Sequence, residues 1–247
     1  MPNNPDTFKP DPYHYPGLEL ELFGRATNWR KYWSSKVKPY LSGEILEVGA
    51  GIGSAVHILH HATYKKWVCL EPDPLLVSAI SADILSGKLS ANIDVQVGDL
   101  SNLNVADRFN SILYIDVLEH IKDDRNQLCE AYAHLLPGGY LVILSPAHPF
   151  LYSSFDKAIG HYRRYNKAML SQIQPTGSRL IEACYLDSFG LFANFGNKII
   201  LHSETPTPFQ IIFWDTILIR LSSFFDRLLR WKLGKTILFV LQKPLEN

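Results

Sequence analysis

The stretch EILEVGAGIG, residues 44–53, decides the fold. Its first half, EILEV, predicts a short buried strand, which leads directly into Gly49, Gly51 and Gly53. Glycines at this point allow a tight turn and a close approach of a ligand to the backbone, and a helix is predicted right after them, over 54–63. The order of strand, glycine turn and helix is typical of ligand-binding α/β sheets. A glycine turn that only links the strand to the helix is the alternative interpretation.

The same alternation continues along the chain. Short, almost wholly apolar segments of this kind are what a parallel sheet with helices on both faces requires. The predicted strands are 67–70, 93–97, 111–115 and 140–144, and the predicted helices are 75–86 and 125–136. The run Pro137-Gly138-Gly139 predicts a sharp end to the last of these helices.

The two ends of the chain predict additional elements. Residues 1–40 are expected to form an aromatic lead-in with one or two cap helices over 18–40, and residues 41–247 the main domain. Residues 180–192 predict a strand pair or a bent strand, and residues 236–241 a closing strand. Between them, 209–232 predicts an amphipathic helix, which makes about 205–233 a helical insertion.

The composition excludes several classes of protein. With 47% hydrophobic and 19% charged residues, the 247-residue chain is not disordered and fits one domain. Lys plus Arg equals Asp plus Glu at 24 each, so the chain lacks a general basic field and no nucleic-acid partner is expected. Without an apolar leader or a spanning segment, a cytoplasmic protein is expected. Cys69, Cys129 and Cys184 are expected to be reduced, buried thiols.

Acids follow three of the predicted strands. Glu71, Asp99 and Asp116 come just after the second, third and fourth strands, so they should meet at the carboxyl edge of the sheet. A carboxylate placed like Glu71 can accept hydrogen bonds from both hydroxyls of a ribose, and one placed like Asp99 can accept from an adenine amine. Ordinary loop acids are the alternative. The G-x-G-x-G spacing is shorter than that of dinucleotide folds, which argues against a pyrophosphate.

The segments EVGAGIG, LEPD, VGDL, YIDVLEH and LLPGGYLVILSP together resemble class I S-adenosylmethionine-dependent methyltransferases over residues 41–146. The resemblance implies a Rossmann-like α/β fold with a seven-stranded, mostly parallel sheet, helices on both faces and a reversed final hairpin. The amphipathic helix within that hairpin is an addition to the pattern. S-adenosylmethionine is the implied cofactor, with S-adenosylhomocysteine as product. The implied cofactor-binding residues are Glu47, Gly49, Gly51, Gly53, Glu71, Pro72, Asp99, Leu100 and Asp116.

Methyl transfer from a sulfonium needs a base only when the acceptor carries a proton. His120 and His161 are the candidate catalytic residues, because imidazole titrates near neutrality. For His120 the alternative is a structural histidine that bonds a loop carbonyl. Some methyltransferases carry a similar E-x-x-E-H run that binds a divalent ion, and Asp116, Glu119 and His120, completed by His148 or His161, would be its counterpart here. The structural interpretation is preferred, and no metal is predicted.

The segment after the fifth strand overhangs the same edge and contains GHYRRY at residues 160–165. Similar D-x-x-x-G-H-x-R-R-Y segments occur in a bacterial branch of the superfamily, which implies acceptor binding. The candidate substrate-binding residues are His148, Tyr162, Arg163 and Tyr165. A guanidinium there would suit a carboxylate or phosphate of the acceptor. A loop fixed by Arg–Asp pairing and aromatic packing is the alternative.

Three further features have structural and functional interpretations. His57, His60 and His61 are expected on a solvated helix face rather than in a metal site, because no acid or cysteine accompanies them. Residues 209–231 are expected to pack across the pocket, with peripheral membrane or dimer contact as the alternative. The N-terminal aromatics either pack on the sheet or cap the acceptor pocket; they are Tyr13, Tyr15, Phe23, Trp29, Tyr32 and Trp33.

The sequence therefore predicts an S-adenosylmethionine-dependent methyltransferase that methylates an oxygen or nitrogen of a small-molecule acceptor. The alternatives are an NAD-dependent oxidoreductase on a similar sheet, a methyltransferase acting on RNA or a lipid-linked acceptor, and a binding module without turnover. The sequence predicts neither the identity of the acceptor nor the oligomeric state.

Overall fold

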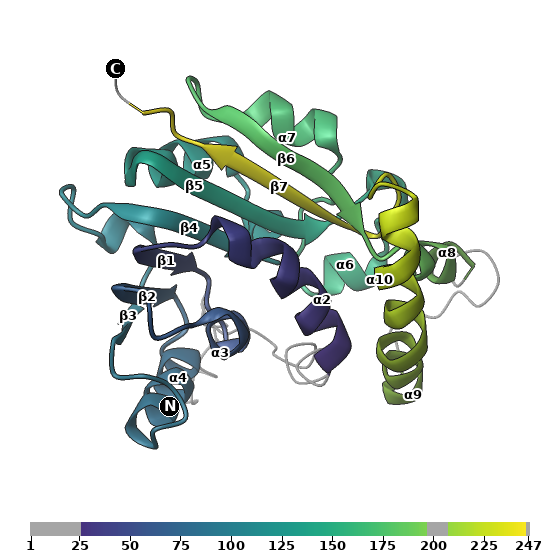
Figure 1. The fold of residues 1–247 in the computed structure, drawn as a ribbon, viewed down its shortest axis with the longest axis horizontal. Helices are drawn as coiled ribbons and strands as arrows, with labels where there is room; N and C mark the ends of the chain where they lie inside the picture. The colour runs from purple at the N-terminus through teal and green to yellow at the C-terminus, as the bar shows by residue number, and fades with distance from the viewer. Residues whose placement is uncertain (1–25, 197–206, 246–247) are drawn as a thin grey trace, which may run out of the picture.

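A seven-stranded sheet with the order β3-β2-β1-β4-β5-β7-β6 lies at the centre of the computed structural model, which describes residues 26–196 and 207–245 (Figure 1). The strands are β1 (Glu44–Val48), β2 (Lys66–Glu71), β3 (Ile93–Val97), β4 (Phe109–Ile115), β5 (Leu135–Pro146), β6 (Arg179–Leu186) and β7 (Thr236–Gln242). Only β7 pairs antiparallel, with β5 on one side and β6 on the other. The predicted fold, including the reversed final hairpin, is confirmed.

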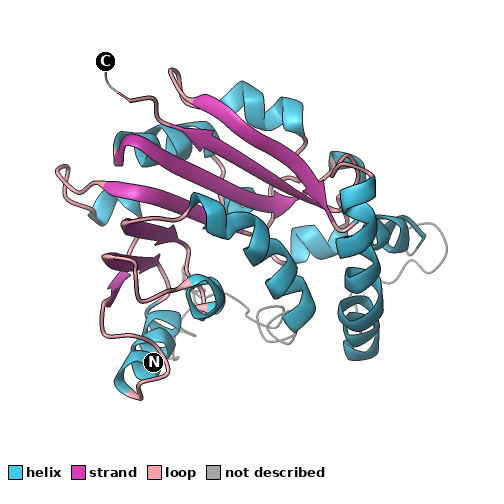
Figure 2. Cartoon of the chain, viewed as in Figure 1, coloured by secondary structure: helices cyan, strands magenta, loops and turns pink. Residues whose placement is uncertain are grey.

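Helices flank the sheet (Figure 2). They are α2 (Thr27–Val37), α3 (Ser54–Leu59), α4 (Pro74–Leu85), α5 (Asp124–Ala133), α6 (Ser154–Ala158), α7 (Lys167–Ile173), α8 (Ser188–Gly196), α9 (Pro208–Phe213) and α10 (Ile219–Leu228). The π-helical turn η6 (Trp214–Leu218) joins α9 to α10. Short 3₁₀ turns are η1 (Lys38–Tyr40), η2 (Leu100–Asn102), η3 (Leu118–His120) and η4 (Pro149–Leu151). Among the residues described, none of these helices has the length and apolar character needed to span a bilayer.

The core has two halves, one on each face of the sheet. Ile45 of β1 belongs to one buried cluster and its neighbour Leu46 to the other, as the period of two along a strand requires. Because both faces are covered, the central strands are apolar at nearly every position, which is why they were recognisable in the sequence.

Several predicted boundaries were wrong. Helix α3 ends at Leu59, because His60 leaves the helical conformation with ψ of 138°. The run Pro137-Gly138-Gly139 lies within β5 rather than ending a helix. A Cβ on Gly139 would lie 2.8 Å from the carbonyl oxygen of Asn110 in β4, so glycine at this position permits close packing of β5 against β4.

The segment 180–192 is one strand followed by a helix, not a strand pair. Asp187, with φ of 68°, turns the chain between β6 and α8. The amphipathic helix predicted over 209–232 is confirmed as α9, η6 and α10. Cys129 on α5 is exposed, which corrects the prediction of three buried thiols.

At the N-terminal end of the described chain, Trp29 and Trp33 of α2 are buried in the core and so pack as structural residues. Tyr13, Tyr15 and Phe23 lie outside the described residues. The domain boundary at residue 40 stays a prediction.

Candidate functional site

The glycine turn after β1 is built so that only glycine fits part of it. Gly49, Gly51 and Gly53 have φ of 68°, 57° and 79°, in the left-handed region that L side chains rarely adopt. A Cβ on Gly49 would lie 2.7 Å from a methyl carbon of Val117. The amide of Gly49 donates to the carbonyl of Leu70 at 2.7 Å, which fixes the turn against the end of β2.

Glu71 joins this turn to the next strand end. Its Oε2 accepts a hydrogen bond from the amide of Gly51 at 2.8 Å, and its Oε1 accepts from the amide of Asp73 at 3.0 Å. Burial raises the pKa of Glu71, and the two backbone donors oppose that rise. Pro72, half-buried, lies between the two acids. The carboxylate therefore lies at the predicted edge, beside the glycine turn.

Glu47 lies beneath the turn and not on its surface, since it is only 3% exposed. Its Oε2 accepts a hydrogen bond from the indole Nε1 of Trp67 at 3.0 Å. Burial raises the pKa of Glu47 to about 8, although the bond from Trp67 opposes the shift. The side chain is therefore mostly protonated at neutral pH, and its predicted contact with a cofactor stays a prediction.

Asp99 and Leu100 follow β3 at the same edge. The amide of Gly98 donates to the carbonyl of Glu71 at 3.0 Å, which holds this turn next to β2. Asp99 is exposed and caps η2 by accepting from the amide of Ser101 at 2.9 Å, whereas Leu100 is 4% exposed. The buried leucine can pack against the face of a flat, partly apolar ring, and the exposed carboxylate can accept a hydrogen bond from an amine on the edge of that ring.

Asp116 follows β4 in a left-handed conformation, with φ of 54°, and its amide donates to the carbonyl of Leu144 at 2.8 Å. Asp116 is exposed to solvent as a residue, but many protein atoms lie near its carboxylate and reduce the hydration of that group. The reduced hydration raises the pKa of Asp116 to about 6, against the opposing positive charges of His161 and Lys235. The sequence analysis did not identify Lys235, because a lysine before a last strand carries no signal of its own.

Next to Asp116, the structure brings together Glu119, His120 and His161. The rings of His120 and His161 meet edge to face with centroids 4.5 Å apart. Glu119 is fully buried; its Oε2 accepts from Ser145 Oγ at 2.6 Å, and its Oε1 lies 3.9 Å from His161 Nε2. Burial, reinforced by the charge of Asp116, holds the pKa of Glu119 well above its usual range.

This cluster has the donor chemistry for a divalent cation. Within residues 26–196 and 207–245, Glu119, His120 and His161 are the potential metal ligands that gather, with their ligand atoms within 4.8 Å of one another. Two imidazoles and a carboxylate suit a transition metal. Asp156 Oδ1 lies 3.0 Å from His161 Nδ1, which would orient that ring as a ligand or as a base. The prediction of no metal stays untested.

The imidazole ring of His120 is neutral at neutral pH. Burial, aided by the charge of His161, lowers the pKa of His120 to about 4, so its ring carries no charge at neutral pH. A neutral ring near the edge can accept a proton or a hydrogen bond, but it is a weak base.

The GHYRRY segment packs directly on η3, because the amide of Tyr162 donates to the carbonyl of Glu119 at 2.8 Å. Asp156 is 1% exposed and accepts two parallel bonds from Arg164, from Nε at 2.8 Å and from a terminal nitrogen at 2.9 Å. Although burial opposes it, the hydrogen bond with His161 and the bonds from Arg164 hold the pKa of Asp156 well below its usual range. The Arg–Asp pairing predicted as the structural alternative is therefore present.

Two predicted acceptor-binding residues, Arg163 and Tyr165, make structural contacts with Asp124. Tyr165 is wholly buried, and its hydroxyl donates to Asp124 at 2.8 Å. Arg163 is an ion-pair partner of the same Asp124 and also donates to the carbonyl of Lys122 at 2.8 Å. Both side chains hold the segment, and their contact with an acceptor stays a prediction.

His148 and Tyr162 take different positions. His148 does not join the cluster: its Nε2 lies 2.9 Å from the carbonyl of Gly234, and its ring stacks on Tyr185 at 4.7 Å. Tyr162 is 55% exposed, so its ring is accessible beside the site. Their contact with an acceptor, and the bacterial branch implied by the segment, stay predictions.

The three histidines near the glycine turn do not share one helix face, because α3 ends before two of them. Their partners are Asp83 for His57, Asn92 for His60 and Thr63 for His61, each at 2.9 Å. The expectation that no acid accompanies them is wrong for His57, whose acid comes from α4. In the described chain they form no metal-binding group.

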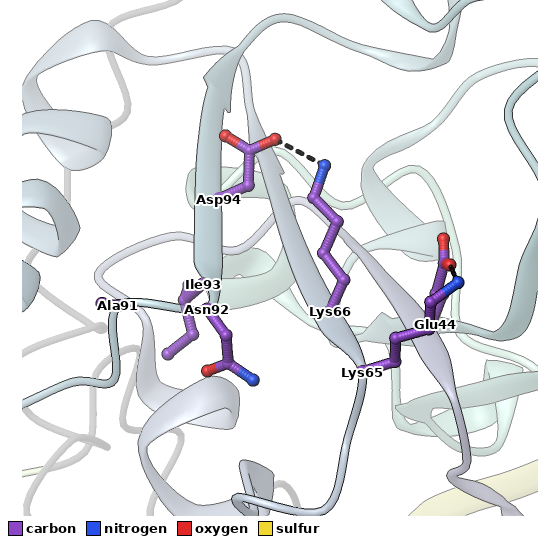
Figure 3. A pocket seen from close by; sticks show the side chains of 7 residues that line it. All are labelled: Glu44, Lys65, Lys66, Ala91, Asn92, Ile93 and Asp94. Atoms are coloured by element: carbon purple, nitrogen blue, oxygen red, sulfur yellow. Dashed lines mark hydrogen bonds and ion pairs between the residues drawn. The ribbon is translucent and has the colours of Figure 1, made fainter.

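An open pocket of about 430 Å³ lies at the opposite edge, where β1, β2 and β3 begin (Figure 3). Its lining residues are Glu44, Lys65, Lys66, Ala91, Asn92, Ile93 and Asp94. The charged ones pair with each other, Lys65 with Glu44 and Lys66 with Asp94 (Figure 3). Ligands of open α/β sheets bind at the carboxyl ends of strands, so this pocket is not the candidate site.

Comparison with known proteins agrees with this geometry. Residues 46–143 match a family described as a methyltransferase domain. Over 138 residues the chain is 28% identical to tRNA U34 carboxymethyltransferase of Shewanella oneidensis, covering 53% of this chain and 40% of the relative. Over 107 residues it is 30% identical to norajmaline N-methyltransferase of Rauvolfia serpentina, covering 42% and 36%. The chain thus spans about two fifths of the length of these relatives.

Among solved structures, the fold is similar to an S-adenosylmethionine-dependent methyltransferase from Clostridium acetobutylicum, with a TM-score of 0.58 at 11% identity, covering 92% of this chain and 98% of the other. The fold is therefore that of the class I methyltransferases. Residues 46–143 are thus similar to a methyltransferase domain, and the fold is shared with a solved S-adenosylmethionine-dependent methyltransferase.

Proposed function

We propose that the protein transfers a methyl group from S-adenosylmethionine to an oxygen or nitrogen of a small-molecule acceptor. The observation that carries the proposal is the 2.8 Å hydrogen bond from the amide of Gly51 to Glu71. It joins the glycine turn to a strand-end carboxylate at one edge of the sheet. The turn of Asp99 is held beside them by the bond from Gly98 to Glu71.

The rim residues divide between the parts of the cofactor. The glycine turn, with Glu47 beneath it, surrounds the methionine part. Glu71, with Pro72, holds the ribose, since its carboxylate lies at the strand end. The exposed carboxylate of Asp99 and the buried Leu100 receive the adenine. Asp116 lies toward the acceptor side.

The bound cofactor supplies a methyl group on a positively charged sulfur, so that the acceptor lone pair forms the new bond and the sulfur keeps the old bonding electrons. The protein aligns the acceptor and excludes water. One of the two histidines, His120 or His161, accepts the proton that the acceptor loses. Asp156 engages Nδ1 of His161, which leaves Nε2 as the proton acceptor.

A small-molecule acceptor is favoured by the net charge of zero, because RNA enzymes need a basic surface. The similarity to norajmaline N-methyltransferase supports it, whereas the similarity to tRNA U34 carboxymethyltransferase keeps RNA as the second candidate. His148 and Tyr162 are the proposed acceptor contacts. A cytoplasmic location is part of this proposal.

The proposal is tested by thermal shift and calorimetry with the full chain. S-adenosylhomocysteine should raise the melting temperature, and NAD should not. Glu71→Ala should weaken S-adenosylhomocysteine binding about tenfold or more, because the ribose and the glycine turn both lose their acceptor. The matched control is Glu130→Ala on the exposed face of α5. Stabilisation by NAD alone would identify an oxidoreductase.

Turnover separates the histidines from the cofactor site. With a panel of amines and phenols as acceptors, His120→Ala and His161→Ala should lower the production of S-adenosylhomocysteine and leave its affinity unchanged. Full activity of both variants would make the two histidines structural. Production stimulated by tRNA and suppressed by salt would favour the RNA candidate.

A further inference from the structure

Helix α9, the turn η6 and helix α10 form one rod at the end of the molecule, beside α8 (Figure 1). We call residues 208–228 the helical arm. A helix at the surface of a globular protein normally turns its apolar side inward and its charges outward. The arm departs from this rule, because its acids face the protein and much of its apolar surface faces solvent.

The two acids of the arm are buried and fully used. Asp215 accepts a hydrogen bond from the amide of Trp29, 2.8 Å away at the start of α2. Asp226 accepts from the amides of Asp187 and Ser188 at 2.7 and 3.1 Å, at the start of α8. Turning the apolar side inward would strip these charges of their partners, at a high cost. The orientation of the arm is therefore fixed by these two acids together with the apolar side chains that it buries in the core, Ile211, Trp214 and Ile219.

The outward side is apolar over the whole length of the arm. Its exposed apolar side chains are Phe209, Ile212, Phe213, Ile217, Leu221, Phe224, Phe225 and Leu228. The neighbouring α8, in ring contact with the arm through Phe189 and Phe225 at 5.4 Å, adds exposed Phe192 and Phe195. An exposed apolar surface of this extent marks a place of interaction.

The charges around this surface select its occupant. Within the described residues 207–233, every exposed charged side chain is a cation, because both acids of the stretch are buried; the cations are Arg220, Arg227, Arg230 and Lys232. A second copy of the chain would bring these cations toward each other across a two-fold interface. Apolar side chains with cations beside them complement a bilayer that carries anionic headgroups.

We propose that the outward side of the helical arm docks the protein on the surface of an anionic phospholipid membrane. The apolar side chains enter the boundary between headgroups and acyl chains, and the arginines contact lipid phosphates or carboxylates. The inference goes beyond the proposed function and does not rest on it, since docking needs no methyl transfer.

The test is sedimentation of the full chain with vesicles of phosphatidylcholine alone or mixed with phosphatidylserine. The wild-type protein should sediment with the mixed vesicles, and added salt should release part of it. Phe224→Ser/Leu228→Ser should reduce the bound fraction about tenfold or more, because both side chains lose their burial in lipid. Arg220→Gln/Arg227→Gln should remove the preference for the mixed vesicles.

The matched control is Leu85→Ser, at a leucine 88% exposed on α4, which should bind like the wild type. Circular dichroism of each variant checks that the fold is kept. Wild-type protein that stays in solution with both kinds of vesicle overturns the proposal, as does equal binding by Phe224→Ser/Leu228→Ser. A dimer that these substitutions dissociate, seen by sedimentation velocity without vesicle binding, would assign the surface to a second copy.

Discussion

Glutamate 47 makes the stability of the protein depend on pH in a way that one substitution can isolate. The pKa of Glu47 rises from 4.5 to about 8 on folding, because the carboxyl is buried under the glycine turn. The folded state therefore holds a proton that the unfolded state releases between these two values. This contribution is fully present below pH 4.5 and is lost as the pH rises through 8.

The size of the effect follows from the shift. One pKa unit corresponds to 1.36 kcal/mol, so between pH 5 and pH 9 ionisation of Glu47 destabilises the folded state by about 4 kcal/mol. Glu47→Gln removes this titration and keeps an oxygen that accepts from Trp67. The variant should gain about that much relative to the wild type across the same range. Any constant cost of the amide cancels in the comparison.

Urea unfolding of both proteins at pH 5, 7 and 9, without cofactor, measures the difference. Glu130→Gln, at an exposed glutamate of α5, is the matched control and should show a constant difference from the wild type. A gap between Glu47→Gln and the wild type that is the same at pH 5 and pH 9 would refute the reasoning, because the carboxyl would then not be protonated in the folded state.

Two further predictions concern the candidate site. Gly49→Ala should destabilise the protein by about 1–3 kcal/mol and weaken S-adenosylhomocysteine binding, because the new Cβ would lie 2.7 Å from Val117 and the backbone is left-handed there. Urea unfolding measures the loss of stability, and calorimetry measures the affinity. Unchanged affinity would show that the turn is not part of the site. Chelation by EDTA should leave turnover unchanged if His120 and His161 act as proton acceptors, whereas loss of turnover restored by Mn²⁺ would assign the cluster with Glu119 to a metal.

The sheet could be predicted from the sequence because its constraints are local. Each central strand is apolar on both faces, and each parallel crossover needs a helix, so the alternation is written in the order of residues. Helix ends were predicted less well. Pro137-Gly138-Gly139 is a strong terminator by local rules, but in the structure Gly138 donates to Lys243 at 2.7 Å, a contact with a distant part of the chain.

The acids of the site were predictable by position and less so by environment. Glu71, Asp99 and Asp116 follow strands, and topology alone brings strand ends to one edge. Whether a side chain near that edge faces a ligand or the protein depends on packing. Tyr165 and Arg163 belong to the same segment as exposed Tyr162, yet both are committed to Asp124, a residue 41 positions before Tyr165 in the chain.

The inverted helical arm had a partial signal in the sequence. Apolar residues at helical spacing predicted the helix, and the periodicity could not say which side faces the protein. That side contains the buried Ile211, Trp214 and Ile219 and the acids Asp215 and Asp226, which accept hydrogen bonds from backbone donors at the starts of α2 and α8. A periodic pattern identifies two faces of a helix, and distant partners decide their orientation.

Backbone strain marks the same edge as the acids do. Outside glycine, left-handed residues in the described chain include Asp116, His148 and Asp187, with φ of 54°, 67° and 68°. Each follows within two residues of the end of β4, β5 or β6, three strands that run in the same direction. Such conformations cost roughly 1 kcal/mol each and persist where the surroundings impose them. Asp116 and His148 were selected from the sequence by their position after predicted strands and by the family resemblance. Their left-handed backbone conformations are a separate observation at the same edge, opposite the open pocket.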